Sequence, residues 1–401
     1  MESDNNISIK GKIDMRFELL EIAKVFLKLG LIAFGGPAVH IALFEDEFTN
    51  KRKWLDRQHF LDLVGATNLI PGPNSTEMAL HIGYQRGGIW GLIIAGFSFI
   101  IPAVLITGFI AYLYSLYGNL PKLQPFLIGI KPAIIVIVLN AVYKLGIKAL
   151  KGWKLIFIAI SISIINFLGV NEVISIIMGG IIGSLFIYLS EKKNIFSSFS
   201  PLILFPIASL VQQLAEKETL NISLTKIFFV CLKIGAVWFG GGYVLVAYFN
   251  GEFVQGLGWL TEKELLDAIA VGQFTPGPFL SSATFIGYQI SGIGGAIAAT
   301  LGILIPSFIF VLILNPFVAK LRASKIFSAF LDAINASAVA VMFVVVINLG
   351  VDILFNSRSG FDWGALLIVL LSSIAFLSVK KLNSAYIVLG GAILGYLLQS
   401  I

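Results

Sequence analysis

Two glycine- and proline-rich breaks interrupt apolar stretches of this chain, and each break occurs twice. The first is Phe34-Gly35-Gly36-Pro37, matched by Phe239-Gly240-Gly241-Gly242. The second is Pro71-Gly72-Pro73, matched by Pro276-Gly277-Pro278. Proline removes a backbone donor and clashes with the preceding turn, so Pro-Gly-Pro cannot lie inside a continuous helix. We therefore predict that a half-helix begins after each break.

The start of a helix presents unpaired N–H groups and roughly half a positive charge, so it binds anions well. Suitable N-terminal residues follow both Pro-Gly-Pro motifs, namely Asn74, Ser75, Ser281 and Ser282. Four helix starts, two from each half of the chain, predict a site for a compact oxyanion. A simple kink is the alternative for any membrane proline. Because both breaks recur at matching positions in the two halves, we favour an oxyanion site over simple kinks.

Polar residues near the breaks are further candidates for this site. Asn68 and Gln273 lie just before the Pro-Gly-Pro motifs and can donate side-chain hydrogen bonds to a substrate. Lys28 and Lys233 lie six residues before Phe34 and Phe239 in apolar surroundings, where an ionisable residue is a functional candidate. They can draw an anion in, or they can extend towards the membrane surface.

Three acidic residues also lie near predicted helix starts. Glu77 comes four residues after Pro73, and Ser282 is its counterpart. Its carboxylate can titrate and couple proton movement to transport, or it can stabilise the helix start as an ordinary first-turn acid, which we favour. Asp62 and Asp267 occupy matching positions, and we interpret them as helix caps.

The composition predicts a polytopic membrane protein. Of the 401 residues, 57% are hydrophobic and only 12% are charged, about half the charged fraction of a soluble chain. Many apolar runs reach the roughly 20 residues that a spanning helix needs. The net charge of +6 fits cytoplasmic loops rather than nucleic-acid binding.

The chain contains an internal repeat. Residues 28–73 align without gaps with residues 233–278 at an offset of 205, and the offset is 204 from Gly83-Tyr84-Gln85 onwards. We predict an N-terminal tail (1–15), a first repeat (16–190), a linker (191–220) and a second repeat (221–401). Each repeat has broken segments followed by a long span and three further spans. The fold class is an all-α membrane protein with broken, re-entrant-like helices around a midplane site.

Basic residues predict opposite orientations for the two repeats. Lys and Arg collect in cytoplasmic loops. Loop 45–58 carries Lys51, Arg52, Lys53 and Arg57, whereas its counterpart 250–264 carries only Lys263, and later loops reverse the bias. An inverted-topology repeat explains this pattern if residues 201–214 cross the membrane in the connection. The alternative is that this short segment lies on the surface and both repeats face one way.

No enzyme constellation is present, so we expect a protein that is not an enzyme. There is no Walker A loop to use ATP, the only cysteine is Cys231, and the three histidines are scattered. We expect no cofactor and no metal site.

The motifs KLGLIAFGGPAVHI (28–41), LIPGPNSTEMALHIGYQRGG (69–88), WFGGGYV (238–244) and FTPGPFLSSATFIGYQ (274–289) resemble the chromate ion transporter family in its two-domain form. The resemblance covers nearly the whole chain. It implies chromate export, with sulfate as a related oxyanion, and it maps family-associated residues onto Phe34 to Pro37 and Pro71 to Pro73. Gly242 departs from the first half, which has Pro37.

The resulting expectation is a secondary active transporter of a tetrahedral oxyanion, with chromate efflux across the plasma membrane as the specific case. A passive anion channel, or transport of another anion such as sulfate, is the alternative. We expect the oxyanion and the lipid bilayer as partners, with a homodimer left open and no nucleic acid.

Overall fold

The fold is described from a computed structural model of the 401-residue chain. The structure describes residues 2–34, 36–118, 120, 124–191, 222–314, 324–356, 360–379 and 383–400. Gly35 and most of the predicted linker, including segment 201–214, lie outside the described residues. So do several basic residues of the later loops whose charge bias is compared in the sequence analysis, namely Lys122, Lys320, Arg322, Arg358, Lys380 and Lys381.

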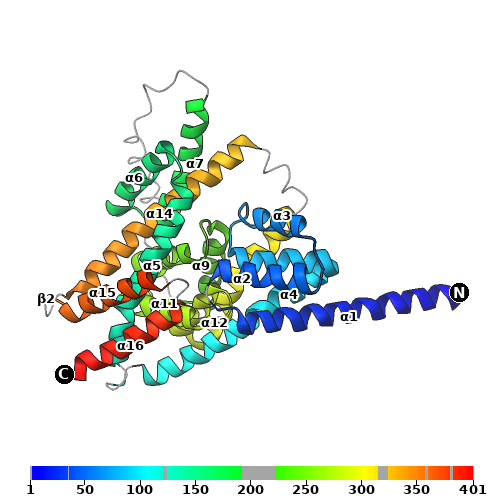
Figure 1. Ribbon diagram of the computed structural model, residues 1–401, viewed down its shortest axis with the longest axis horizontal. Helices are drawn as coiled ribbons and strands as arrows, with labels where there is room; N and C mark the ends of the chain where they lie inside the picture. Colours follow the sequence, from blue (N-terminus) through cyan, green and yellow to red (C-terminus); the bar gives the residue numbers. More distant parts are fainter. Residues whose placement is uncertain are drawn as a thin grey trace.

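The first repeat contains seven α-helices and a π-helical turn within the described residues. They are α1 (Glu2–Ile32), α2 (Pro37–Glu45), η1 (Asp46–Lys51), α3 (Arg57–Thr67), α4 (Asn74–Tyr117), α5 (Gln124–Ala149), α6 (Trp153–Phe167) and α7 (Glu172–Glu191). The helices cross at varied angles rather than forming a parallel bundle (Figure 1).

The second repeat follows the same order. Its elements are α9 (Leu224–Val237), η3 (Gly242–Val244), α10 (Leu245–Phe249), η4 (Asn250–Gly256), α11 (Glu262–Phe274), η5 (Phe279–Ser281), α12 (Ser282–Leu314), α14 (Lys325–Leu354), α15 (Trp363–Ser378) and α16 (Ser384–Ser400). A two-residue hairpin, β1 (Phe355–Asn356) with β2 (Gly360–Phe361), joins α14 to α15. The protein is therefore helical, as the composition predicts.

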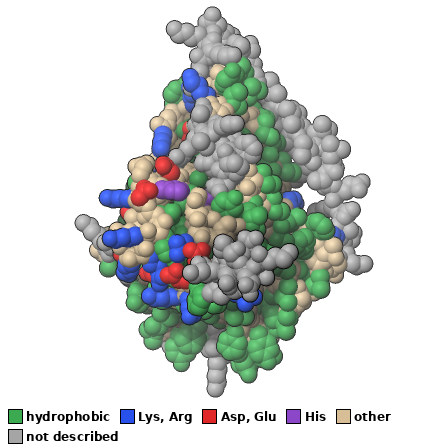
Figure 2. Space-filling view, turned by 90° about the vertical axis from the view of Figure 1, so that its right-hand side faces the viewer, with side chains coloured by type: hydrophobic (Ala, Val, Ile, Leu, Met, Phe, Trp, Pro, Cys, Tyr) green, Lys and Arg blue, Asp and Glu red, His purple; other side chains and the backbone are tan. Residues whose placement is uncertain are grey.

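Five of the described helices are long and apolar enough to cross a membrane. They comprise Asn74–Tyr117, Gln124–Ala149, Glu172–Ser190, Phe279–Ile313 and Lys325–Leu354. Three shorter apolar helices, Trp153–Phe167, Trp363–Ser378 and Ser384–Leu398, occupy the other positions where closing spans are predicted. In Figure 2, charged side chains gather on one side of the face shown, and hydrophobic side chains cover its lower part.

Helix α4 is folded back on itself at a pair of glycines. Gly87 and Gly88 leave the helical conformation, with φ of 59° at Gly88. A Cβ added at Gly83 would overlap the carbonyl oxygen of Gly91, although residues eight apart in a straight helix are about 12 Å apart. Residues 74–86 and 89–117 therefore form a hairpin, and only the second limb is long enough to span.

Helix α12 repeats this hairpin. Ser291 and Gly292 leave the helical conformation, with φ of 57° at Gly292, and a Cβ at Gly287 would overlap the carbonyl of Gly295. These positions match those of α4 at the offset of 204. The glycines let the two limbs touch, backbone to backbone, in both repeats.

Helix packing divides the protein into two units that each combine both repeats. One unit holds the breaks: α1 packs on α4, α9 packs on α12, and α4 packs on α12. In the other, α14 packs on α6 and α7, while its counterpart α5 packs on α15 and α16. We call these the break unit (α1–α4 and α9–α12) and the scaffold unit (α5–α7 and α14–α16). The two repeats are thus intertwined.

Gly83→Ala tests the close contact inside the α4 hairpin. Overpacking costs roughly 1–3 kcal/mol, because the added methyl group meets the Gly91 carbonyl. We expect a lower melting temperature of the purified protein in detergent. Gly390→Ala is the control, since nothing lies within 4 Å of its added Cβ. Equal melting temperatures for the two variants would contradict the hairpin.

Candidate functional site

In each glycine-rich break, a glycine with positive φ lies directly before the start of a new helix. Gly36 precedes Pro37, the first residue of α2, with φ of 86°. Its counterpart Gly241 has φ of 92° and precedes η3 at Gly242. A side chain at positive φ costs roughly 1–2 kcal/mol, which explains the glycines. Gly240 also has positive φ, and Phe34 is 38% exposed.

The two Pro-Gly-Pro motifs also precede helix starts, as predicted. Helix α4 begins at Asn74 directly after Pro73, and η5 and α12 follow Pro278. Gly72 and Gly277 have φ of 142° and 97°. All four prolines are buried (Pro71, Pro73, Pro276 and Pro278).

Reciprocal backbone hydrogen bonds join each Pro-Gly-Pro motif to the other repeat. The Gly72 N–H donates to the Trp238 carbonyl at 2.7 Å, and the Gly277 N–H donates to the Ala33 carbonyl at 2.8 Å. Both pairs are related by the offset of 205. Such an exchange of equivalent contacts is what a two-fold axis between the repeats produces.

The glycine-rich breaks also lie beside each other. A Cβ at Gly242 would lie 3.7 Å from Pro37, and a Cβ at Gly36 would lie 4.0 Å from the Tyr243 hydroxyl. All four breaks therefore meet at one junction between the repeats. The sequence predicts these breaks but does not show that they converge.

The side chains of His40 and Trp238 also contact backbone carbonyls at this junction, and the motifs did not single out either residue. His40 Nε2 lies 3.0 Å from the Ala33 carbonyl, the acceptor that Gly277 also uses. Trp238 Nε1 donates to the Gly241 carbonyl at 2.9 Å. Both side chains are buried. The counterpart of His40 is Leu245, which cannot form such a hydrogen bond. Comparing the two repeats therefore could not have identified His40 as a junction residue.

Buried hydroxyl groups and one carboxyl group surround the starts of α4 and α12. Glu77 is fully buried and Ser75 is nearly so. In this cluster, five side chains of the described residues have buried oxygens without a hydrogen-bond partner, namely Thr76, Glu77, Ser281, Ser282 and Ser307. Unpaired buried polar groups are costly, so this cluster is the polar feature that most needs an explanation. Thr76 and Ser307 were not among the predicted site residues.

The two amide residues before Pro-Gly-Pro differ in their surroundings. Asn68 is exposed, donates to the Val64 carbonyl at 3.0 Å and accepts a hydrogen bond from Asn74 at 2.7 Å. Gln273 is buried, and its Oε1 accepts from Ser384 at 3.0 Å and from Tyr243 at 3.3 Å. Both side-chain oxygens are thus engaged within the protein.

The two lysines lie away from the cluster around Glu77. Lys28 is exposed on α1, about one turn before the helix ends. Lys233 is also exposed and forms an ion pair with the buried Glu252. In the first repeat the matching Glu47 pairs instead with Arg52 at 2.8 Å. A role for either lysine in attracting an anion stays a prediction.

The predicted capping role of Asp267 is wrong. Thr261 caps α11 with a full capping box, whereas Asp267 is buried and accepts a 2.6 Å hydrogen bond from Tyr114. Asp62 does not cap α3 either, because Asp56 does. Lys131 from α5 attracts Asp267 electrostatically. A buried polar contact between the repeats therefore replaces the expected cap.

The junction can bind a compact anion through neutral donors. Helix starts favour anions, and hydroxyl groups can donate hydrogen bonds to oxyanions. The Gly72 and Gly277 N–H groups are already bonded, so the free donors are the hydroxyls and the first N–H groups of the half-helices. The described residues contain no group of three or more His, Cys, Asp or Glu residues arranged to hold a metal ion.

Comparison with known proteins agrees with these motifs. The chromate transporter family model matches residues 20–184 and 225–396. This chain belongs to the chromate transporter family. The two matched stretches lie within the two predicted repeats, and the transporter is a multi-pass membrane protein with long apolar helices.

Two chromate transport proteins match this transporter over almost its whole length, and a shorter relative matches part of it. A probable chromate transport protein of Synechococcus elongatus is 28% identical, covering 96% of each chain. A chromate transport protein of Cupriavidus metallidurans is 26% identical, covering 94% of this chain and 93% of its own. The uncharacterized transporter YwrA of Bacillus subtilis is 26% identical over 35% of this chain and 80% of its own. No solved structure matches the chain.

Gly72→Ala and Gly241→Ala separate backbone strain from packing at the junction. Both glycines have positive φ, so each variant carries backbone strain of roughly 1–3 kcal/mol. Only at Gly72 would the methyl group also overlap Glu77 and Ser307, since nothing lies within 4 Å at Gly241. We expect Gly72→Ala to lower the melting temperature in detergent further than Gly241→Ala. The reverse order would contradict the described junction.

Proposed function

We propose that this chain is a secondary active transporter of a tetrahedral oxyanion, with chromate efflux across the plasma membrane as the specific case. The observation that carries the proposal is the convergence of four helix breaks on one junction between the repeats. The family and the relatives named chromate transport protein supply the substrate class.

The half-helix starts hold the oxyanion in this proposal. The site comprises both glycine-rich breaks, both Pro-Gly-Pro motifs and the hydroxyl groups of Ser75, Ser281 and Ser282. Asn68 and Gln273 border it, Lys28 and Lys233 attract the anion, and Glu77 is the coupling group. Discontinuous helices around a midplane site are typical of inverted-repeat transporters.

Opposite orientation of the two repeats belongs to the same proposal. The reversed loop charges and the reciprocal backbone bonds support it. The position of Arg86, at the end of the first α4 limb, supports the proposal that the chain from α3 to this limb enters the membrane and returns to the same side. Its guanidinium lies 5.3 Å from the ring centre of Trp54, which precedes α3, so the path from α3 to Arg86 begins and ends on one side.

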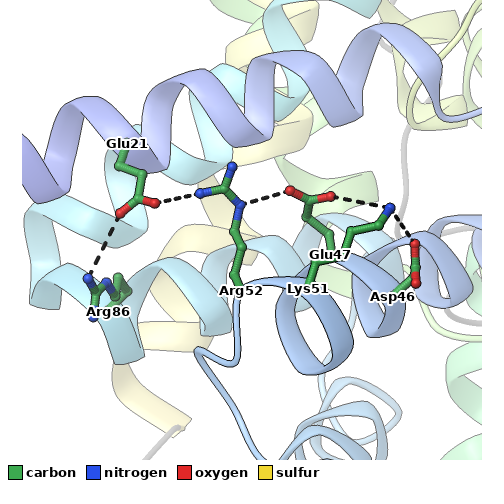
Figure 3. Close-up of polar contacts among 6 residues, drawn as sticks. All are labelled: Glu21, Asp46, Glu47, Lys51, Arg52 and Arg86. Atoms are coloured by element: carbon green, nitrogen blue, oxygen red, sulfur yellow. Dashed lines mark hydrogen bonds and ion pairs between the residues drawn. The ribbon is translucent and has the colours of Figure 1, made fainter.

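A charged network lies on this side of the first repeat, and its two arginines have uncharged counterparts in the second repeat. Arg52 pairs with Glu21 of α1 at 2.5 Å and with Glu47 of η1 at 2.8 Å, and Arg86 reaches Glu21 at 3.9 Å (Figure 3). The counterparts of Arg52 and Arg86 are Leu257 and Ile290. Basic residues mark the cytoplasmic face, so we place this network there.

Unequal burial of matching residues favours a carrier over a channel. Asp62 and Asn68 of α3 are exposed, whereas their counterparts Asp267 and Gln273 of α11 are buried against the scaffold unit. A carboxylate is not stable in lipid, so the exposed α3 side opens to water. In this proposal the α3 side of the junction faces water and the α11 side is closed against the scaffold unit, an asymmetry of the kind that alternating access requires.

The packing of Phe239, which begins the glycine-rich break of the second repeat, differs in the same way between the repeats. Phe239 packs edge-on against Phe330 of α14 with ring centres 5.9 Å apart. In the first repeat, the counterpart of Phe330 is Phe126, which stacks on Tyr396 instead. The break unit thus contacts the scaffold unit more closely on the second-repeat side, and motion between these units would exchange the two arrangements.

Cysteine labelling tests the exchange of accessibility. In sealed vesicles with cytoplasmic-side access, Asp62→Cys should react readily with a membrane-impermeant maleimide. Leu266→Cys, at a position 3% exposed, should react slowly with the same reagent supplied from the opposite side of the membrane. Saturating chromate that shifts the carrier should protect the cysteine at position 62 from the reagent and expose the one at position 266. The native Cys231 is fully buried and should stay unlabelled. Reactivities that never change with substrate would favour the channel alternative.

Flux of radiolabelled chromate into vesicles containing the purified protein tests the function itself. With an imposed membrane potential or pH gradient, we expect accumulation above equilibrium, competed by sulfate. A channel conducts only down the gradient, so accumulation distinguishes the two. Protein-free vesicles are the control, and passive equilibration alone would reject secondary active transport.

A further inference from the structure

Glu77 is a buried acid at the junction without a partner. Its side chain is 0% exposed, and neither carboxyl oxygen has a hydrogen-bond partner among the described residues. Its counterpart Ser282 is uncharged. A carboxylate that only stabilised the helix start would be expected to accept hydrogen bonds from the first N–H groups, but no side chain caps α4.

The carboxyl group faces the other repeat across Gly72. A Cβ on Gly72 would overlap Glu77 Oε1 and lie 2.5 Å from Ser307 Oγ. Ser307 comes from α12, is fully buried and has no partner among the described residues. Glu77 and Ser307 therefore flank the same backbone position, where the Pro-Gly-Pro motif of one repeat meets the long helix of the other.

Neither carboxyl oxygen of Glu77 has a hydrogen-bond partner among the described residues that would compensate a charge there. Helix α12 carries no charged residue, and His81 is the other titratable group nearby on α4 itself. On α3, Asp62 and His59 lie towards the outside, and on α1 Lys28 is exposed. On α9, Lys233 is paired with Glu252. An unpaired buried charge is very costly, so the site favours the uncharged carboxyl group.

We propose that Glu77 carries the coupled proton and that the oxyanion binds only when Glu77 is protonated. This deepens the proposed function and rests on it. A protonated carboxyl group donates a hydrogen bond to the oxyanion, whereas a carboxylate beside a dianion repels it. The proton binds from one side, leaves with the anion on the other, and both move in the same direction.

The test compares the wild type with Glu77→Gln in sealed vesicles, using chromate at pH values where its dianion predominates. In the pH range where Glu77 of the free carrier has lost its proton, one linked proton weakens apparent chromate affinity about tenfold per pH unit as pH rises. We expect this slope, and alkalinisation of the side that chromate leaves, in the wild type. Glu77→Gln keeps a donor but cannot titrate, so its affinity should be independent of pH and its flux should move no protons.

Ser282→Ala is the matched control at the equivalent position of the second repeat, and it should keep the pH slope. Chromate flux in the wild type without proton movement would overturn the proposal while leaving the proposed function intact. Proton movement that persists in Glu77→Gln would also overturn it. The wild-type measurement decides even if that variant does not fold, and absence of any chromate flux would instead reject the proposed function.

Discussion

Backbone groups at the helix breaks need partners inside the protein, because lipid offers none. The reciprocal bonds from Gly72 to Trp238 and from Gly277 to Ala33 meet this need. Each repeat satisfies the break of the other, so neither break is complete alone. The α4 and α12 hairpins depend on glycine for a related reason, since a side chain at Gly83 or Gly287 would overlap the backbone of the facing limb.

Intertwining of the repeats determines which parts of the transporter can move. Helices α5 and α14 each pack on the closing spans of the other repeat. The sequence repeats are therefore not the packing units, and the proposed transport motion is one between the break unit and the scaffold unit. Their closer contact around α11, where Asp267 bonds to Tyr114 and Gln273 to Ser384, gives the molecule its unequal sides.

Differences between the repeats concentrate the chemistry on a few residues. Glu77, His40 and Lys131 have uncharged counterparts in Ser282, Leu245 and Asn335. The parts that the two repeats share build the junction, and these unmatched side chains make its two halves chemically different. The network around Arg52 is similarly confined to one repeat and ties α1 to η1 on one side.

The sequence by itself determines the helical membrane class, the repeat and the positions of the breaks, because hydropathy and proline chemistry act locally. Helix α4 begins at Asn74 as Pro73 predicts. Only the tertiary structure shows that Gly72 meets Trp238, that Asp267 is buried while Asp62 is exposed, and that Ser307 lies beside Glu77. These depend on contacts between residues more than 150 positions apart and on how one repeat packs against the other, which local sequence patterns do not encode.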